Sequence, residues 1–101
     1  MNCLNASEIA AYVGFAQRSG AVLYGEERIL EKLGRCVVVL IDASAPEKYR
    51  ERLIKRCGGV PTAEVDDLRL ATHRDNVKSI GVTDQSLGNA ILRFRGSYER
   101  N

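Results

Sequence analysis

Hydrophobic residues along the first part of the chain change from helical spacing to short continuous runs. Apolar positions recur at helical spacing over residues 6–18, behind the capping pair Asn5 and Glu8, and predict a first helix. Ser19-Gly20 ends it, because glycine accepts the left-handed closing conformation. The apolar segment Ala21–Tyr24 then predicts a brief edge strand. A second helix is expected over Glu26–Leu33, with two carboxylates in its first turn.

The clearest strand signal is the run Cys36–Ile41. It is continuously apolar and rich in β-branched residues, without the alternation of a strand that faces water on one side. This pattern is typical of a central strand covered on both faces. It therefore predicts a sheet between two layers of helices, with Val37–Ile41 at its centre.

The second half of the chain continues the alternation of helices and strands. Ser44–Glu47 has the pattern of a capping box and predicts a third helix over Ala45–Cys57. The inward residues of this helix are expected to be Tyr49, Leu53, Ile54 and Cys57. The remaining expected elements are a strand at Val60–Val65, a short helix capped by Asp66-Asp67, a strand at Val77–Val82 and a last helix capped by Thr83 or Asp84.

Strands that alternate with helices imply βαβ crossovers. We therefore expect the α/β class, as a three-layer αβα sandwich with a mixed sheet of about four strands. With 101 residues and no linker or repeat, the chain is interpreted as one domain over residues 1–101. Its net charge is +2, divided into −1 for residues 1–45 and +3 for residues 46–101. A basic second half permits nucleic-acid binding without requiring it.

Several classes of protein are disfavoured by what the sequence lacks. No run of ~18 apolar residues predicts a membrane span, and Met1–Ala11 has no signal-peptide pattern, so a cytoplasmic protein is expected. The three cysteines Cys3, Cys36 and Cys57 form no C-x-x-C pair. Neither a disulfide framework nor a zinc site is indicated.

Catalytic chemistry has little support in the sequence. No phosphate loop, dinucleotide fingerprint, zinc-protease motif or nucleophile elbow is present, and no cofactor is predicted. His73, the only histidine, could pair with Cys36 or Cys57, but both cysteines are expected to pack as small hydrophobic residues. The acidic cluster Glu26, Glu27 and Glu31 admits a metal site or a solvated helix start, and we favour the latter. The stripe Lys48, Arg52, Lys55 and Arg56 is likewise interpreted as a solvated face. A binding protein rather than an enzyme is expected.

Four short motifs, in order across residues 9–92, together resemble a known family. The stretch Val13–Glu27 is similar to the opening "G-L-A-x-R-A-G-x-L-x-x-G-E-E" of a group of small bacterial RNA-binding proteins. Val37–Ser44 resembles the family's strand followed by "D-A-S", and Lys55–Pro61 its "x-K-C…V-P" segment. Ile80–Asp84 matches the "G-V-T-D" turn. The group belongs with the kink-turn-binding ribosomal proteins, of the L-seven-Ae and L-thirty-e type.

The resemblance implies a three-layer αβα sandwich that binds structured RNA, such as ribosomal RNA or another kinked RNA, with the ribosome as a candidate partner. In kink-turn-binding relatives, the RNA lies against the start of the second helix, and a loop before the last strand packs against a flipped-out base. Carried over by position, the implied contacts at the second helix are Gly25, Glu26, Glu27, Arg28, Glu31 and Lys32. Those in the loop are Arg74, Asn76 and Val77, with Asp75 between them.

The sequence departs from this pattern at two of these positions. Glu27 and Glu31 place carboxylates where kink-turn binders offer an amide or an ammonium group, and carboxylates repel phosphate. Weak binding to a standard kink-turn is therefore expected, with Arg28 as the main charged donor. The alternative is a protein-interaction module that kept the fold and uses its acidic second helix for a protein partner. Oligomeric state is not predicted.

Overall fold

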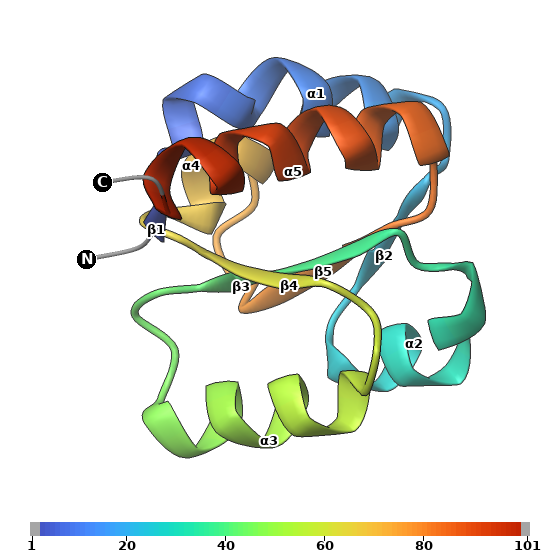
Figure 1. Cartoon of the computed structure of the whole chain (residues 1–101), viewed down its shortest axis with the longest axis vertical. Helices are drawn as coiled ribbons and strands as arrows, with labels where there is room; N and C mark the ends of the chain where they lie inside the picture. Colours follow the sequence, from blue (N-terminus) through green and yellow to red (C-terminus); the bar gives the residue numbers. More distant parts are fainter. Residues whose placement is uncertain (1–2, 100–101) are drawn as a thin grey trace.

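The computed structural model of the protein has a five-stranded mixed sheet between two layers of helices (Figure 1). It describes residues 3–99, with side chains through residue 95. In chain order the elements are β1 (Cys3–Leu4), α1 (Ala6–Arg18), β2 (Val22–Tyr24), α2 (Glu26–Glu31), a 3-10 helix η1 (Leu33–Arg35), β3 (Val38–Asp42), α3 (Glu47–Cys57), β4 (Thr62–Val65), α4 (Leu68–Thr72), β5 (Ser79–Val82) and α5 (Gln85–Glu99). None of the helices within residues 3–99 has the length and apolar character needed to cross a membrane.

The strand order is β1-β4-β3-β5-β2, so β3 is the central strand, as predicted. The strands β1, β4 and β3 run parallel, whereas β5 runs antiparallel to both β3 and β2. The three-layer sandwich and the mixed sheet are therefore confirmed. The expected sheet of about four strands gains a fifth, because Cys3 and Leu4 pair with Glu64 and Val65.

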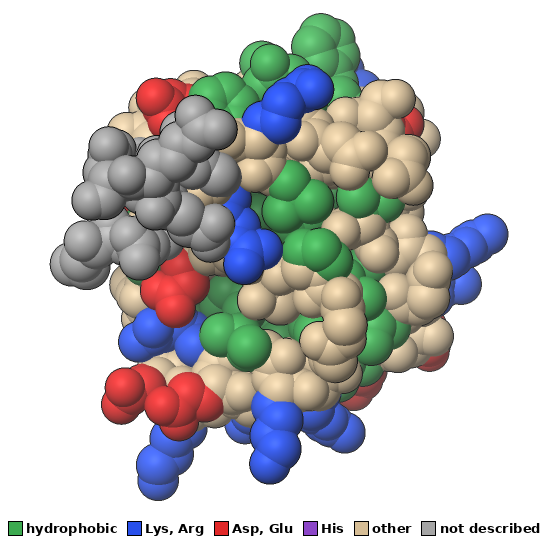
Figure 2. All heavy atoms as spheres, viewed as in Figure 1, with side chains coloured by type: hydrophobic (Ala, Val, Ile, Leu, Met, Phe, Trp, Pro, Cys, Tyr) green, Lys and Arg blue, Asp and Glu red, His purple; other side chains and the backbone are tan. Residues whose placement is uncertain are grey.

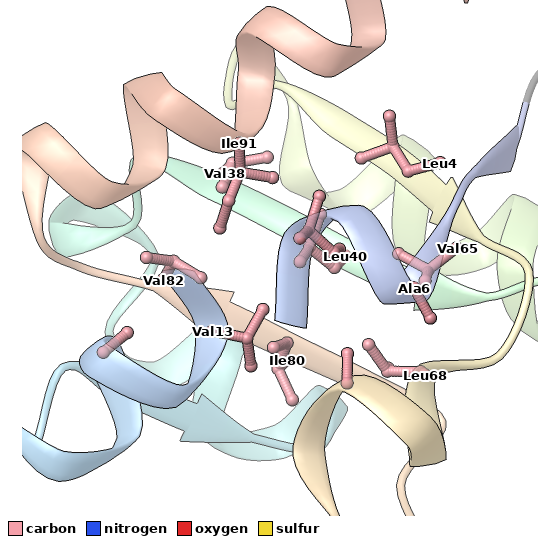
Figure 3. Close-up of a cluster of buried hydrophobic side chains, with 13 residues drawn as sticks. Leu4, Ala6, Val13, Val38, Leu40, Val65, Leu68, Ile80, Val82 and Ile91 are labelled. Carbon is pink, nitrogen blue, oxygen red and sulfur yellow. The ribbon is translucent and has the colours of Figure 1, made fainter. Parts of the chain in front are cut away.

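The central strand β3 supplies both halves of the core. Val38 and Leu40 belong to the cluster between the sheet and helices α1, α4 and α5, part of which Figure 3 shows. Val39 and Ile41 belong to a second cluster on the side of α2 and α3. All four side chains are fully buried. Each contributes about 1.5–3 kcal/mol through removal of apolar surface from water, which explains why the strand is apolar at every position.

The first helix begins and ends where its local signals indicate. The Asn5 side-chain oxygen accepts hydrogen bonds from the backbone N–H groups of Ser7, at 2.8 Å, and Glu8, at 3.3 Å. After Arg18 the chain turns through Gly20, whose φ is 73°. Such a cap contributes about 1 kcal/mol to stability, so this helix is specified largely by its own residues.

The predicted caps of α3 and α4 are both wrong, and at α4 the buried carboxylate of Asp42 takes the place of the predicted one. Pro46 occupies the N-cap position of α3 without a capping side-chain hydrogen bond, and the Ser44 hydroxyl bonds to Asp42 instead. At the start of α4, the backbone N–H of Leu68 donates to Asp42 at 2.7 Å. Asp42, at the end of the central strand, thus accepts a hydrogen bond from the first backbone N–H of a helix that begins far along the chain.

Two further expectations for this half of the chain need correction. Asp66 does not cap α4; its carboxylate accepts a hydrogen bond from the backbone N–H of Ala6, at 2.9 Å, and so caps α1. Ile54, expected to face inward, is 40% exposed, whereas Leu53 and Cys57 of the same helix are buried. The inward face of α3 is therefore narrower than predicted.

Candidate nucleic-acid interface

Two segments that the resemblance singles out meet where β2 ends and β5 begins. These strands are antiparallel neighbours, and Tyr24 pairs with Ile80. The next residue after β2, Gly25, donates its backbone N–H to the carbonyl of Ser79 at 3.0 Å. Its φ of 87° is one that residues with a Cβ rarely adopt, so glycine is required for the chain to turn from β2 into α2.

A hollow of about 330 Å³ lies between these segments and α3, and we call it the loop hollow. Its lining residues are Tyr24, Gly25, Tyr49, Asn76, Val77 and Lys78. Gly25, Asn76 and Val77 were expected at an RNA site and are brought together here. The sequence reasoning missed the other three residues. Lys78 directly follows the expected loop, but Tyr49 comes from α3, and no local pattern connects it to this place.

Cations lie against the aromatic rings of the hollow. The guanidinium carbon of Arg74 is 3.9 Å from the ring centroid of Tyr24, and the Lys78 ammonium is 5.7 Å from that of Tyr49. The Tyr49 hydroxyl forms a 2.7 Å hydrogen bond with the hydroxyl of Ser79 at the start of β5. This hydrogen bond fixes the ring of Tyr49 against the loop. The arrangement combines positive charge with aromatic surface, both of which nucleic-acid sites use.

The loop also borders a second hollow, of about 530 Å³. Its lining residues are Asp42, Ser44, Ala45, Pro46, Arg69, Asp75, Asn76, Val77 and Lys78. Residues 76–78 therefore line both hollows and separate them. The loop therefore presents the same three residues to both hollows.

On the outer face of α2, the residues expected to contact RNA carry charges of both signs. Glu27, Arg28 and Glu31 are exposed. The Arg28 and Glu31 side chains are 60% and 63% exposed and approach to only 3.9 Å, so their mutual attraction is weak. Lys32 is half-buried at the end of α2. These groups leave a nearly neutral surface beside the loop hollow.

Glu26, also expected among the RNA contacts, is turned toward α3. Its carboxylate accepts two hydrogen bonds from the Arg52 guanidinium, at 2.9 and 2.8 Å, and lies 3.7 Å from Arg56. The hydrogen bond from Arg52 is the main cause that holds the pKa of Glu26 below its usual range. Glu26 thus links α2 to α3 through two arginines of the predicted basic stripe.

The cysteines and acidic groups show little sign of reactive chemistry. Cys3, Cys36 and Cys57 are free thiols, and burial raises the pKa of each. Cys36 and Cys57 pack in the core on the α2 and α3 side, as expected of small hydrophobic residues. Among the described residues, His, Cys, Asp and Glu side chains form no group of three or more that could hold a metal ion.

Comparison with known proteins places the fold among solved structures. No family model and no curated protein matches the sequence. A protein of unknown function from Bacillus halodurans superposes with a TM-score of 0.79 at 21% identity, over 87% of this chain and 96% of that chain. The 15.5kD RNA binding protein of Giardia lamblia superposes with a TM-score of 0.74 at 20% identity, over 92% of this chain and 86% of that chain. At these identities, the likeness establishes a shared fold.

Proposed function

We propose that this protein binds structured RNA through the loop hollow and the adjoining start of α2. The observation that carries the proposal is the meeting of Gly25 with Asn76 and Val77 in one hollow, although these residues are far apart in the chain. The same fold occurs in an RNA-binding protein of Giardia lamblia, which supports this assignment. Binding rather than catalysis is the proposed role.

The chemistry of the hollow suits an RNA loop or bulge. Sequence-specific RNA recognition uses unstacked bases, which stack on aromatic or guanidinium planes. Tyr24, Tyr49 and the Arg74 guanidinium supply such planes, and Val77 adds apolar surface. Lys78 supplies a positive charge for the phosphates around an unstacked base.

The finer assignment follows the family resemblance. We infer that the RNA is a kink-turn or a related kinked element, and that the protein acts in the cytoplasm, in association with ribosomes or translation. The exposed carboxylates Glu27 and Glu31 oppose phosphate, so affinity for a standard kink-turn is expected to be low.

A titration with labelled RNA tests the proposal. A kink-turn RNA and a straight duplex of equal length are titrated at two salt concentrations against the parent protein and Lys78→Gln. The matched control Arg18→Gln removes one exposed positive charge from α1. We expect Lys78→Gln to weaken kink-turn binding and to lower its salt dependence, and Arg18→Gln to resemble the parent. Equal effects of the two variants, or no retention of either RNA by the parent, would contradict the proposal.

A protein-interaction module is the second candidate, favoured by the exposed carboxylates of Glu27 and Glu31 on α2. A protein partner that contacts these carboxylates would be captured equally well with and without added RNA. Glu27→Gln would then weaken capture, whereas Lys78→Gln would leave it unchanged. In cells, crosslinking followed by sequencing of bound RNA separates the two candidates directly.

A further inference from the structure

We propose that an RNA backbone seated in the loop hollow continues over α3, where Arg52 and Arg56 bind its phosphates. This inference rests on the proposed RNA-binding function and adds to it a second contact surface. We call this surface, formed by Lys78, Tyr49, Arg52 and Arg56, the α3 track. It joins the hollow to one side of a helix that the family resemblance leaves without a role.

Tyr49 provides the continuity between the hollow and the helix. Its ring lines the loop hollow, with the Lys78 ammonium 5.7 Å from the ring centroid. The guanidinium carbon of Arg52 lies 5.4 Å from the same centroid. One aromatic ring therefore has a loop cation and a helix cation beside it. Arg56 follows Arg52 one turn later along α3, so positive charges continue away from the hollow.

Glu26 holds both arginines in place before any RNA arrives. Its carboxylate, on a side chain only 19% exposed, bonds to Nε and Nη2 of Arg52 and lies near Nη1 of Arg56. A guanidinium has five N–H donors, and Glu26 accepts from two of those of Arg52, so donors remain for a phosphate. The arginine side chains are 49% and 58% exposed. Side chains ordered in advance lose less entropy when they bind.

The charge balance around α3 favours a polyanion. Two arginines share the one carboxylate of Glu26, which leaves a net positive charge at the junction of α2 and α3. Lys48 and Lys55 add exposed positive charge on the outer side of the same helix, next to the carboxylates of Glu47 and Glu51. Figure 2 shows Lys and Arg side chains projecting from the lower edge of the molecule, where α3 lies in Figure 1. Because the track is continuous with the loop hollow, we assign it to the same RNA.

The test compares arginines at different places on the surface. Arg52→Gln and Arg56→Gln are each titrated with a kink-turn RNA that has long flanking stems, at two salt concentrations. Arg18→Gln is the matched control, because Arg18 also lies over an aromatic ring one turn earlier on its own helix, 4.8 Å from the centroid of Phe15. We expect each α3 variant to weaken binding roughly three- to tenfold. The slope of log affinity against log salt concentration should become shallower by about 1. Arg18→Gln should bind like the parent.

Thermal unfolding of each variant identifies any loss of folding. If Arg52→Gln unfolds, Arg56→Gln, whose contact with Glu26 is longer, decides the result. If Lys78→Gln weakens binding while both α3 variants behave like Arg18→Gln, the α3 track is overturned and the proposed function stands; that outcome is also expected if α3 binds an acidic protein. If the parent retains no RNA, both proposals are overturned together.

Discussion

The side-chain amide of Gln17 donates a hydrogen bond to the hydroxyl of Tyr24, with 3.0 Å between the two atoms. The same amide nitrogen donates to the carbonyl of Thr72 at 2.9 Å. Gln17 on α1 therefore ties the end of β2 to the end of α4. His73 then takes a left-handed φ of 59° and leads into the 74–78 loop. One side chain of α1 thus contacts Tyr24, which lines the loop hollow, and also the end of the helix that precedes the 74–78 loop.

This connection predicts different effects for two substitutions of Tyr24. Tyr24→Phe removes the hydroxyl but keeps the ring beneath Arg74, so we expect a loss of about 1 kcal/mol in unfolding free energy and near-parent RNA binding. Tyr24→Leu also removes the ring and is expected to weaken RNA binding several-fold more than Tyr24→Phe. Urea unfolding and RNA titration of both variants provide the measurements. Equal RNA affinity of the two would mean that the ring is no part of the RNA surface.

Removal of the carboxylates on the outer face of α2 is expected to tighten RNA binding. Changing Glu27 to Asn and Glu31 to Lys removes two negative charges and adds one positive charge beside the proposed RNA site. Each charge change is expected to contribute on the order of 1 kcal/mol at moderate salt, so kink-turn binding should tighten. Arg28→Ala should weaken it. All three proteins are titrated at two salt concentrations, with a straight duplex as control. If the double variant binds the kink-turn no better than the parent, RNA does not dock on α2.

The ion pair between Glu26 and Arg52 predicts a loss of stability in acid. The hydrogen bond from Arg52 lowers the pKa of Glu26 from 4.5, so the folded state holds this carboxylate charged more readily than the unfolded state. The pair therefore stabilises the fold above about pH 4.5, and this contribution is lost as pH falls through the lowered pKa. Because the groups are partly exposed and solvent screens their attraction, this contribution is expected to be small.

Urea unfolding of the parent and Glu26→Gln across this pH range tests the prediction. The two unfolding free energies should differ at neutral pH and converge in acid. Arg52→Gln, which removes the other partner, should show the same convergence with the parent. A difference that stays constant from neutral to acid pH would show that the ionised pair does not stabilise the fold.

Replacement of Gly88 in α5 by alanine is expected to destabilise the protein, although helix propensity alone favours alanine. Alanine normally stabilises a helix interior by up to about 1 kcal/mol over glycine. A Cβ at Gly88, however, would lie 2.5 Å from a methyl carbon of Val37 and 2.7 Å from its Cβ. We expect Gly88→Ala to lower the unfolding free energy by about 1–3 kcal/mol. Gly34→Ala is the control, because no heavy atom lies within 4 Å of the added carbon. Equal stability of both variants would contradict this close packing.

Elements with local signals could be predicted from the sequence. The Asn5 cap and the apolar spacing behind it define α1 over Ala6–Arg18, and the unbroken apolar run places β3 at the centre of the sheet. By contrast, Cys3–Leu4 is too short to carry a pattern, and it becomes a strand only because β4 offers a free edge to pair with.

Interactions between distant segments could not be predicted in the same way. Asp42 directly follows the predicted strand Cys36–Ile41, and its capping of α4 depends on how β3 and α4 pack. For the candidate site, the resemblance supplied Gly25 and the 74–77 loop. Tyr49 and Arg52 join the site only because α3 packs beside α2, a placement that no pattern within α3 reveals.

The two outermost strands of the sheet are short, with two residues in β1 and three in β2. An exposed strand offers unpaired backbone groups as a template for another chain, and shortening it is one way to prevent such growth. Within residues 3–99, neither border of the sheet is long enough to guide an incoming strand through more than a few backbone hydrogen bonds. Recognition must therefore depend on side chains and surface shape, and the folded molecule is poorly suited to seed fibrils.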